Sequence, residues 1–211
     1  MLLQQGLMFV AALAAVGFGV ARPERQAGPA AVTARLLGIG ALALISALRD
    51  GPQMLTLALA ADAVGGALLD APSSLARTLG WSGLMLGRLA CVSLLLPVCG
   101  GAAAFAAEPL RNLALGAVAA GWSVSLAWLW PRLGANKALG LAYGLASFAA
   151  VLTTLALPAY FFLAISGGAC LVAADILCVA GLAGRLDGAG ARLAWWLRLV
   201  GAAQLACACL K

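Results

Sequence analysis

Long apolar stretches follow one another along the whole chain and leave little room for anything else. Of the 211 residues, 64% are hydrophobic and 9% are charged, and the mean hydropathy is +1.06. A soluble globule needs more polar residues than this on its surface. A stretch of about 20 apolar residues matches the roughly 30 Å hydrocarbon layer of a bilayer. The sequence therefore predicts an all-α, polytopic membrane protein that forms a single transmembrane helical domain over residues 1–211.

Charged residues and prolines separate these stretches and predict a bundle of about eight transmembrane helices. The first stretch has no preceding Lys or Arg and is long for a signal peptide, so we expect it to be retained. Two spans meet at Pro158 with almost no linker, so one broken helix, and thus about seven spans, is the alternative. The expected spans are 2–21, 32–48, 53–70, 80–99, 110–130, 138–157, 159–183 and 192–210.

Basic residues are distributed unevenly between the loops on the two sides of this predicted bundle. One side carries Arg22, Arg25, Arg35, Arg77, Arg132, Lys137, Arg185 and Arg192, and the other carries Arg49, Arg111 and Lys211. By the positive-inside rule the first side is cytoplasmic, in a cell membrane that we expect to be of the bacterial inner type. The net charge of +6 is spread over these loops, which favours membrane lipids as partners and argues against nucleic acid.

The six cysteines lie within the predicted spans and lack the paired spacing of metal sites. They are Cys91, Cys99, Cys170, Cys178, Cys207 and Cys209, and the chain has no histidine. We interpret them as small packing residues and expect neither a metal nor a cofactor. Without histidine a Ser-His-Asp triad is impossible.

Two aspartates, Asp62 and Asp175, lie inside predicted spans. A carboxylate at bilayer depth costs on the order of 3 kcal/mol, so such groups face the bundle interior, pair with a cation or hold a proton. Each aspartate lies eight residues from the cytoplasmic end of its span, and Arg88 and Arg198 lie equally deep, roughly 12 Å from that end. We expect the four to line one polar cavity that opens toward the cytoplasm. Two purely structural ion pairs are the alternative.

Short motifs surround these residues. The third span contains Ala60-Ala61-Asp62-Ala63-Val64, the seventh contains Gly167-Gly168 and Ala174-Asp175-Ile176-Leu177, and the last contains Ala202-Ala203-Gln204-Leu205. In order and spacing the chain resembles the YhhN-like family of eight-helix membrane proteins, the lysoplasmalogenases. That family has a small residue before the aspartate of its third helix, a glycine-rich start and an aspartate in its seventh, and a glutamine in its last.

The resemblance implies a hydrolase that cleaves the vinyl ether bond of a lysophospholipid, a lysoplasmalogen, and releases a fatty aldehyde. Asp62 and Asp175 would then be the catalytic general acid and base, with one kept protonated by burial and the other kept ionised by an arginine. Substrate-binding roles follow for Arg88 and Arg198, since guanidinium groups suit phosphate. The resemblance implies substrate-binding roles also for Gln204 and for Arg35, which stands where the family has a Lys-Pro pair.

The chain also departs from the family pattern. The family has a histidine and a tyrosine late in its fourth helix, where this chain reads Cys91-Val92-Ser93-Leu94-Leu95-Leu96-Pro97. Two other functions therefore stay open. One is a catalytically inactive membrane scaffold. The other is a small proton-coupled transporter in which the intramembrane aspartates relay protons.

Overall fold

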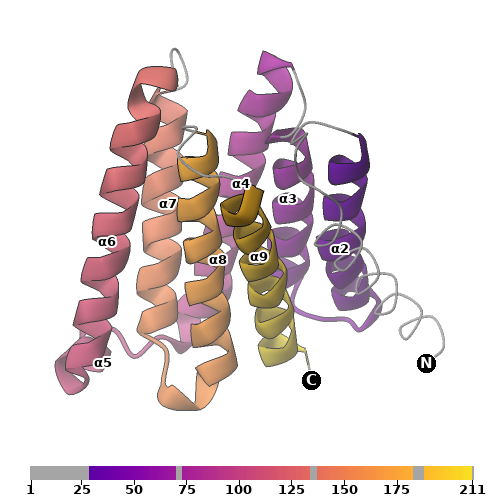
Figure 1. Ribbon diagram of the computed structural model, residues 1–211. Coiled ribbons are helices and arrows are strands. Elements are labelled where there is room, and N and C mark those ends of the chain that lie inside the picture. Colours follow the sequence, from indigo (N-terminus) through magenta and orange to yellow (C-terminus); the bar gives the residue numbers. More distant parts are fainter. Residues whose placement is uncertain (1–28, 70–72, 134–136, 183–187, 211) are drawn as a thin grey trace.

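The computed structural model describes residues 29–69, 73–133, 137–182 and 188–210. These residues form helices and turns and contain no strand, which confirms the all-α prediction for this part of the chain. Long helices lie side by side and run alternately in opposite directions (Figure 1). They are α2 (Pro29–Leu48), α3 (Gln53–Leu69), α4 (Ser74–Leu95), α6 (Pro109–Leu129), α7 (Lys137–Leu155), α8 (Phe162–Leu182) and α9 (Gly188–Cys209), with the short α5 (Ala102–Ala107) and the 3-10 segments Leu96–Val98, Trp130–Arg132 and Ala159–Phe161.

The expected spans from 32 onward overlap these helices, although several helices begin earlier than expected, α9 by four residues and α2 by three. Helix α4 begins six residues earlier than expected, because the Ser73 hydroxyl accepts a hydrogen bond from the Ala76 amide at 3.0 Å and caps the helix. Helix α5 was not expected. The chain reverses direction between α7 and α8 around Pro158, so these are two helices and not one broken helix. The expected span 2–21 lies outside the described residues.

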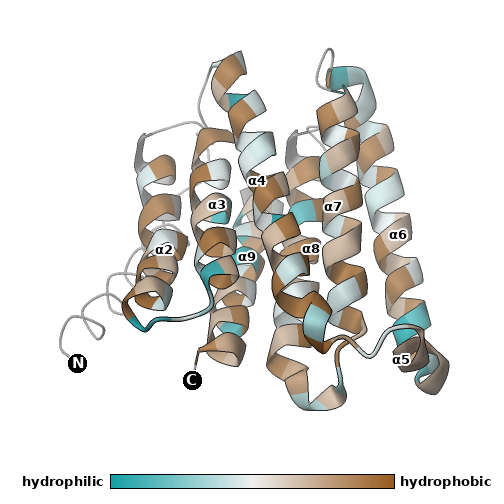
Figure 2. Ribbon diagram, turned by 180° about the vertical axis from the view of Figure 1, so that it is seen from behind, coloured by the Kyte–Doolittle hydropathy of each residue, from teal (hydrophilic) through white to brown (hydrophobic). Residues whose placement is uncertain are grey.

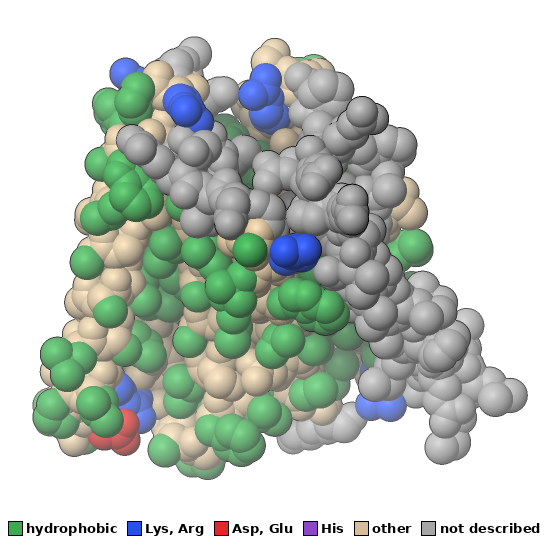
Figure 3. Space-filling model, viewed as in Figure 1, with side chains coloured by type: hydrophobic (Ala, Val, Ile, Leu, Met, Phe, Trp, Pro, Cys, Tyr) green, Lys and Arg blue, Asp and Glu red, His purple; other side chains and the backbone are tan. Residues whose placement is uncertain are grey.

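Four helical segments are long and apolar enough to cross a membrane: Ser74–Val98, Pro109–Arg132, Lys137–Leu155 and Ala159–Ala180. Hydrophobic residues predominate along the helices (Figure 2), and many hydrophobic side chains lie on the face of the molecule seen in Figure 3. Among the exposed ones are Leu110 at 76%, Leu145 at 64% and Phe162 at 65% of their full accessible area. Water would penalise so much exposed apolar surface, whereas lipid chains would not. These features are compatible with a multi-pass membrane protein.

Glycines allow two pairs of helices to approach closely. A Cβ atom added to Gly65 of α3 would lie 2.9 Å from the Gly80 carbonyl oxygen of α4. A Cβ added to Gly201 of α9 would lie 2.7 Å from the Gly167 carbonyl oxygen of α8. Small residues at helix crossings are typical of packing in lipid, where close van der Waals contact holds helices together. The pairs α3/α4 and α8/α9 are thus tightly joined hairpins.

Helices α4 and α8 connect the two hydrophobic clusters of the described core near the middle of their length. One cluster joins Leu95 and Leu171 to residues of α2, α3 and α9, and the other joins Leu84 and Val172 to residues of α6 and α7 and to Leu69 at the end of α3. Charged side chains on the inward faces of these two helices are therefore held far from water.

Candidate functional site

Four charged side chains from four helices meet inside the bundle. They are Asp62 of α3, Arg88 of α4, Asp175 of α8 and Arg198 of α9, and each is between 0% and 3% exposed. We call these four residues the charge cluster. The structure thus brings together all four residues that the sequence places at one depth, and their formal charges sum to zero.

Asp175 is the most strongly bound member of the cluster. Arg88 binds it with two parallel hydrogen bonds, from Nε to Oδ2 at 2.7 Å and from Nη2 to Oδ1 at 2.8 Å. Arg198 Nη2 donates to Oδ1 at 2.7 Å, and the Ser147 hydroxyl of α7 donates to Oδ2 at 3.3 Å. Four donors, three of them from charged groups, stabilise an ionised carboxylate. The geometry therefore holds Asp175 as an anion.

Asp62 is bound much more weakly. Its Oδ1 accepts one hydrogen bond, from Arg88 Nη2 at 3.1 Å, and lies 3.6 Å from Arg198 Nη1. Its Oδ2 is buried and has no hydrogen-bond partner among the described residues. The Nη1 atom of Arg198 likewise makes no hydrogen bond in the described part. The arginines thus donate more hydrogen bonds to Asp175 than to Asp62, and Asp62 Oδ2 is available to another partner.

The arginines use half of their guanidinium nitrogens within the cluster. Arg88 Nε and Nη2 and Arg198 Nη2 all donate to aspartate oxygens. The other three nitrogens make no hydrogen bond in the described part: Arg88 Nη1, Arg198 Nε and Arg198 Nη1. A phosphate placed at these donors would also meet two negative charges, which disfavours the predicted phosphate-binding role of Arg88 and Arg198.

Helix α7 contributes two polar side chains that the sequence reasoning missed, Ser147 and Tyr143. The Tyr143 hydroxyl interacts electrostatically with Asp175 but makes no hydrogen bond of good geometry among the described residues. Its ring packs edge-on against Trp81 and Trp122, at centroid distances of 5.0 and 5.6 Å. The signal that points to this pair is the spacing of four residues, which places both side chains on one face of α7.

Gln204 is a further predicted site residue, and no hydrogen bond in the described part joins it to the charge cluster. Gln204 of α9 packs beside Gly167 of α8, and its buried Oε1 has no hydrogen-bond partner among the described residues. Arg35 lies in α2, but its side chain is outside the described part of the structure. The structure therefore groups the two aspartates with Arg88 and Arg198 and does not join Gln204 to them.

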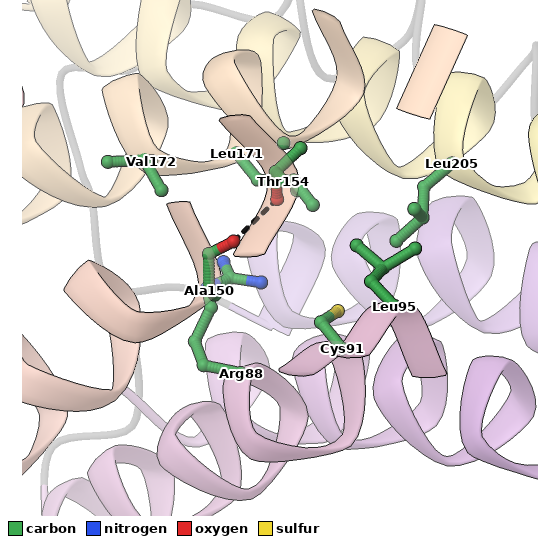
Figure 4. A pocket seen from close by; sticks show the side chains of 9 residues that line it. Arg88, Cys91, Leu95, Ala150, Thr154, Leu171, Val172 and Leu205 are labelled. Atoms are coloured by element: carbon green, nitrogen blue, oxygen red, sulfur yellow. Dashed lines mark hydrogen bonds between the residues drawn. The ribbon is translucent and has the colours of Figure 1, made fainter. Parts of the chain in front are cut away.

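A small pocket adjoins Arg88 (Figure 4). Its free space is about that of a single water molecule. Its lining is mainly apolar, unlike the polar cavity expected from the sequence, and the Thr154 hydroxyl is bound to the Ala150 carbonyl. The lining residues are Arg88, Cys91, Leu95, Ala150, Thr154, Gly168, Leu171, Val172 and Leu205.

No family model, curated protein or solved structure matches this chain. The likeness to the YhhN-like family therefore stays a prediction drawn from the residues.

Proposed function

We propose that this protein is a membrane-embedded hydrolase of the lysoplasmalogenase type. The observation that carries the proposal is the unequal binding of the two buried carboxyl groups. Asp175 accepts four hydrogen bonds, whereas Asp62 Oδ2 accepts none. Acid catalysis with two carboxyl groups needs such a difference, since one must carry a proton while the other stays ionised.

Asp62 is the general acid in this proposal. Its protonated carboxyl group donates a proton to the alkenyl carbon of the vinyl ether, which leaves an oxocarbenium ion on the carbon bonded to oxygen. The Asp62 carboxylate formed in this step stabilises the cation and then takes a proton from the water that adds to it. The resulting hemiacetal breaks the bond between its carbon and the glycerol oxygen, and the proton of its hydroxyl group passes to that oxygen. The products are a fatty aldehyde and a glycerol hydroxyl, and Asp62 is protonated again.

Asp175 and the arginines support this step without reacting. Arg88 and Arg198 keep Asp175 ionised, and the fixed negative charge of Asp175 stabilises the oxocarbenium ion. Arg198 Nη1, which makes no hydrogen bond in the described part, can bind the incoming water or the departing oxygen. Arg35 remains a proposed ligand of the substrate, and Gln204 remains a proposed hydrogen-bond partner of the water or of the leaving hemiacetal.

The proposal is tested by measuring aldehyde release from a lysoplasmenyl lipid by purified protein in lipid nanodiscs. We expect wild-type protein to release aldehyde and Asp62→Asn to lose at least about 100-fold in rate, a typical contribution of general acid catalysis. The matched control is Asp50→Asn: Asp50 is an exposed loop aspartate with φ of 50°, a conformation that asparagine tolerates. Wild-type turnover in folded Asp62→Asn protein would refute the proposal.

A second candidate function is proton-coupled transport. The feature that favours it is the repetition of an Asp-to-Arg hairpin: Asp62 and Arg88 lie on α3/α4, and Asp175 and Arg198 lie on α8/α9. Paired repeats around a buried charged site are typical of transporters. Acidification of proteoliposomes that depends on an added solute, without lipid breakdown, would favour this function over hydrolysis.

A further inference from the structure

The pocket beside Arg88 lies on one particular side of the charge cluster. Leu95 and Leu205 lie seven residues after Arg88 and Arg198 along helices that run in the same direction. Gly168 lies seven residues before Asp175 on α8, which runs the opposite way. All three offsets point toward the same ends of the helices, roughly 10 Å from the cluster.

The opposite ends of the helices carry four basic residues, Arg77, Arg132, Lys137 and Arg192. At the helix ends beyond the pocket, Arg49 and Arg111 are offset by Asp50 and Glu108. An anionic headgroup is attracted to the basic ends. The cluster therefore separates an apolar pocket from a basic surface.

From this arrangement we propose that the pocket binds the hydrocarbon chain of a single-chain ether lipid, next to the bond held at Asp62, while the phosphate faces the basic helix ends. This inference rests on the proposed function and specifies how the substrate lies. It assigns chain binding to Leu95, Leu171 and Leu205. Between Arg88 and these leucines the described lining is apolar apart from the Cys91 thiol, a weak hydrogen-bonding group, and the Thr154 hydroxyl, which is bound to the Ala150 carbonyl, so an apolar ligand suits the pocket best.

One wall of the pocket is rigid and the other is adaptable. A Cβ atom on Gly168 would overlap the Thr154 side chain, so α7 and α8 cannot approach more closely there. Leu95 and Leu205 lie on the other side of the pocket from Thr154 (Figure 4) and are 5% and 2% exposed, and Leu171, which is 5% exposed, lies beside Thr154. Because the present space holds little more than a methylene group, these leucines must change rotamer to admit the chain.

The test uses a saturated 1-O-alkyl lysophosphocholine that carries a photoreactive diazirine within the first carbons of its chain. The saturated ether has no double bond to protonate, so it reports binding without turnover. After irradiation of wild-type protein in nanodiscs, mass spectrometry should locate cross-links at pocket residues of α4, α8 or α9, and excess unlabelled lipid should suppress them. Cross-links only at lipid-facing residues such as Leu145, or at the basic helix ends, would overturn the inference.

Variants give a second readout. Leu205→Ala should enlarge the pocket and shift binding toward longer chains, by about fourfold in affinity per added methylene group. Leu193→Ala is the matched control on the same helix, because Leu193 is 52% exposed. If Leu205→Ala does not fold, Leu205→Met serves instead and should broaden chain-length preference. An unchanged preference in the folded variant counts against the inference.

The two proposals fail separately. Pocket cross-links without aldehyde release from a vinyl ether lipid would refute the hydrolase and leave the lipid orientation intact. Aldehyde release with cross-links elsewhere would refute the orientation and leave the hydrolase intact.

Discussion

Arg88 and Asp175 form a two-pronged ion pair that joins α4 and α8 across 87 residues of sequence. The distances are 2.7 Å from Nε to Oδ2 and 2.8 Å from Nη2 to Oδ1. Nη2 also donates to Asp62 at 3.1 Å, so one guanidinium group links three helices. The stability of the charge cluster therefore depends on the Arg88 guanidinium group.

Replacing Arg88 should destabilise the bundle strongly. Arg88→Ala leaves two buried carboxyl groups with one arginine, and breaking such a pair costs about 3–5 kcal/mol. Arg88→Lys should recover only part of the loss, because an ammonium group cannot bind a carboxylate through two parallel bonds. Unfolding in detergent, with exposed Arg77→Ala as control, measures both effects. Equal stability of Arg88→Ala and Arg77→Ala would contradict the prediction.

The two aspartates should differ in their effect on stability. Asp175→Asn replaces a carboxyl group that accepts four hydrogen bonds, whereas Asp62→Asn replaces one that accepts a single bond. We expect Asp175→Asn to cost about 3–5 kcal/mol and Asp62→Asn about 1–3 kcal/mol. The same unfolding assay ranks them, and the reverse order would show that Asp62 is the more tightly held group.

The α8/α9 crossing should tolerate no added methyl group at Gly201. Gly201→Ala would place its Cβ 2.7 Å from the Gly167 carbonyl oxygen, so the helices must separate, at a cost of about 1–3 kcal/mol. Gly40 of α2 has no atom within 4 Å of the equivalent position. Gly40→Ala should therefore be neutral or stabilising by up to about 1 kcal/mol. Similar melting temperatures for the two variants would argue against the close crossing.

Arg111 should stabilise the turn between α7 and α8. Its Nη1 donates to the Leu155 and Leu157 carbonyl oxygens at 2.6 and 2.7 Å. Arg111→Ala leaves both acceptors unpaired, and we expect a loss of about 1–3 kcal/mol. Hydrogen exchange near residues 155–162 should rise more than in Arg77→Ala protein. Unchanged exchange would mean that other groups or water satisfy these carbonyls.

The same arginine gives one pH effect outside the spans. The hydrogen bond and charge of Arg111 lower the pKa of Glu108. A carboxyl group with a lowered pKa adds stability above its unfolded-state value and loses it as the pH falls through the folded-state value. We expect a small loss of stability below about pH 4 that is absent in Glu108→Gln protein. A loss of equal size in that variant would assign the effect to other carboxyl groups.

The sequence by itself determined which segments of the described part are helical and predicted one common level for four charges. Alternation of apolar stretches with charges and prolines gives the approximate helix ends, although α4 begins six residues before its expected start, and a constant rise per residue converts position into a relative level. The common level of Asp62, Arg88, Asp175 and Arg198 follows from that one-dimensional reasoning. Helix α5 was not predicted, because its six residues are too few to show a helical periodicity.

Only the tertiary structure decided how these charges are shared. Depth says nothing about the rotation of a helix around its axis or about its neighbours, which depend on contacts such as those of Gly65 and Gly201. For that reason the two-pronged pairing of Arg88 with Asp175, the weaker hold on Asp62 and the contribution of Ser147 were not predictable from the sequence. Close packing of helices in three dimensions, and not hydropathy, makes the two aspartates different.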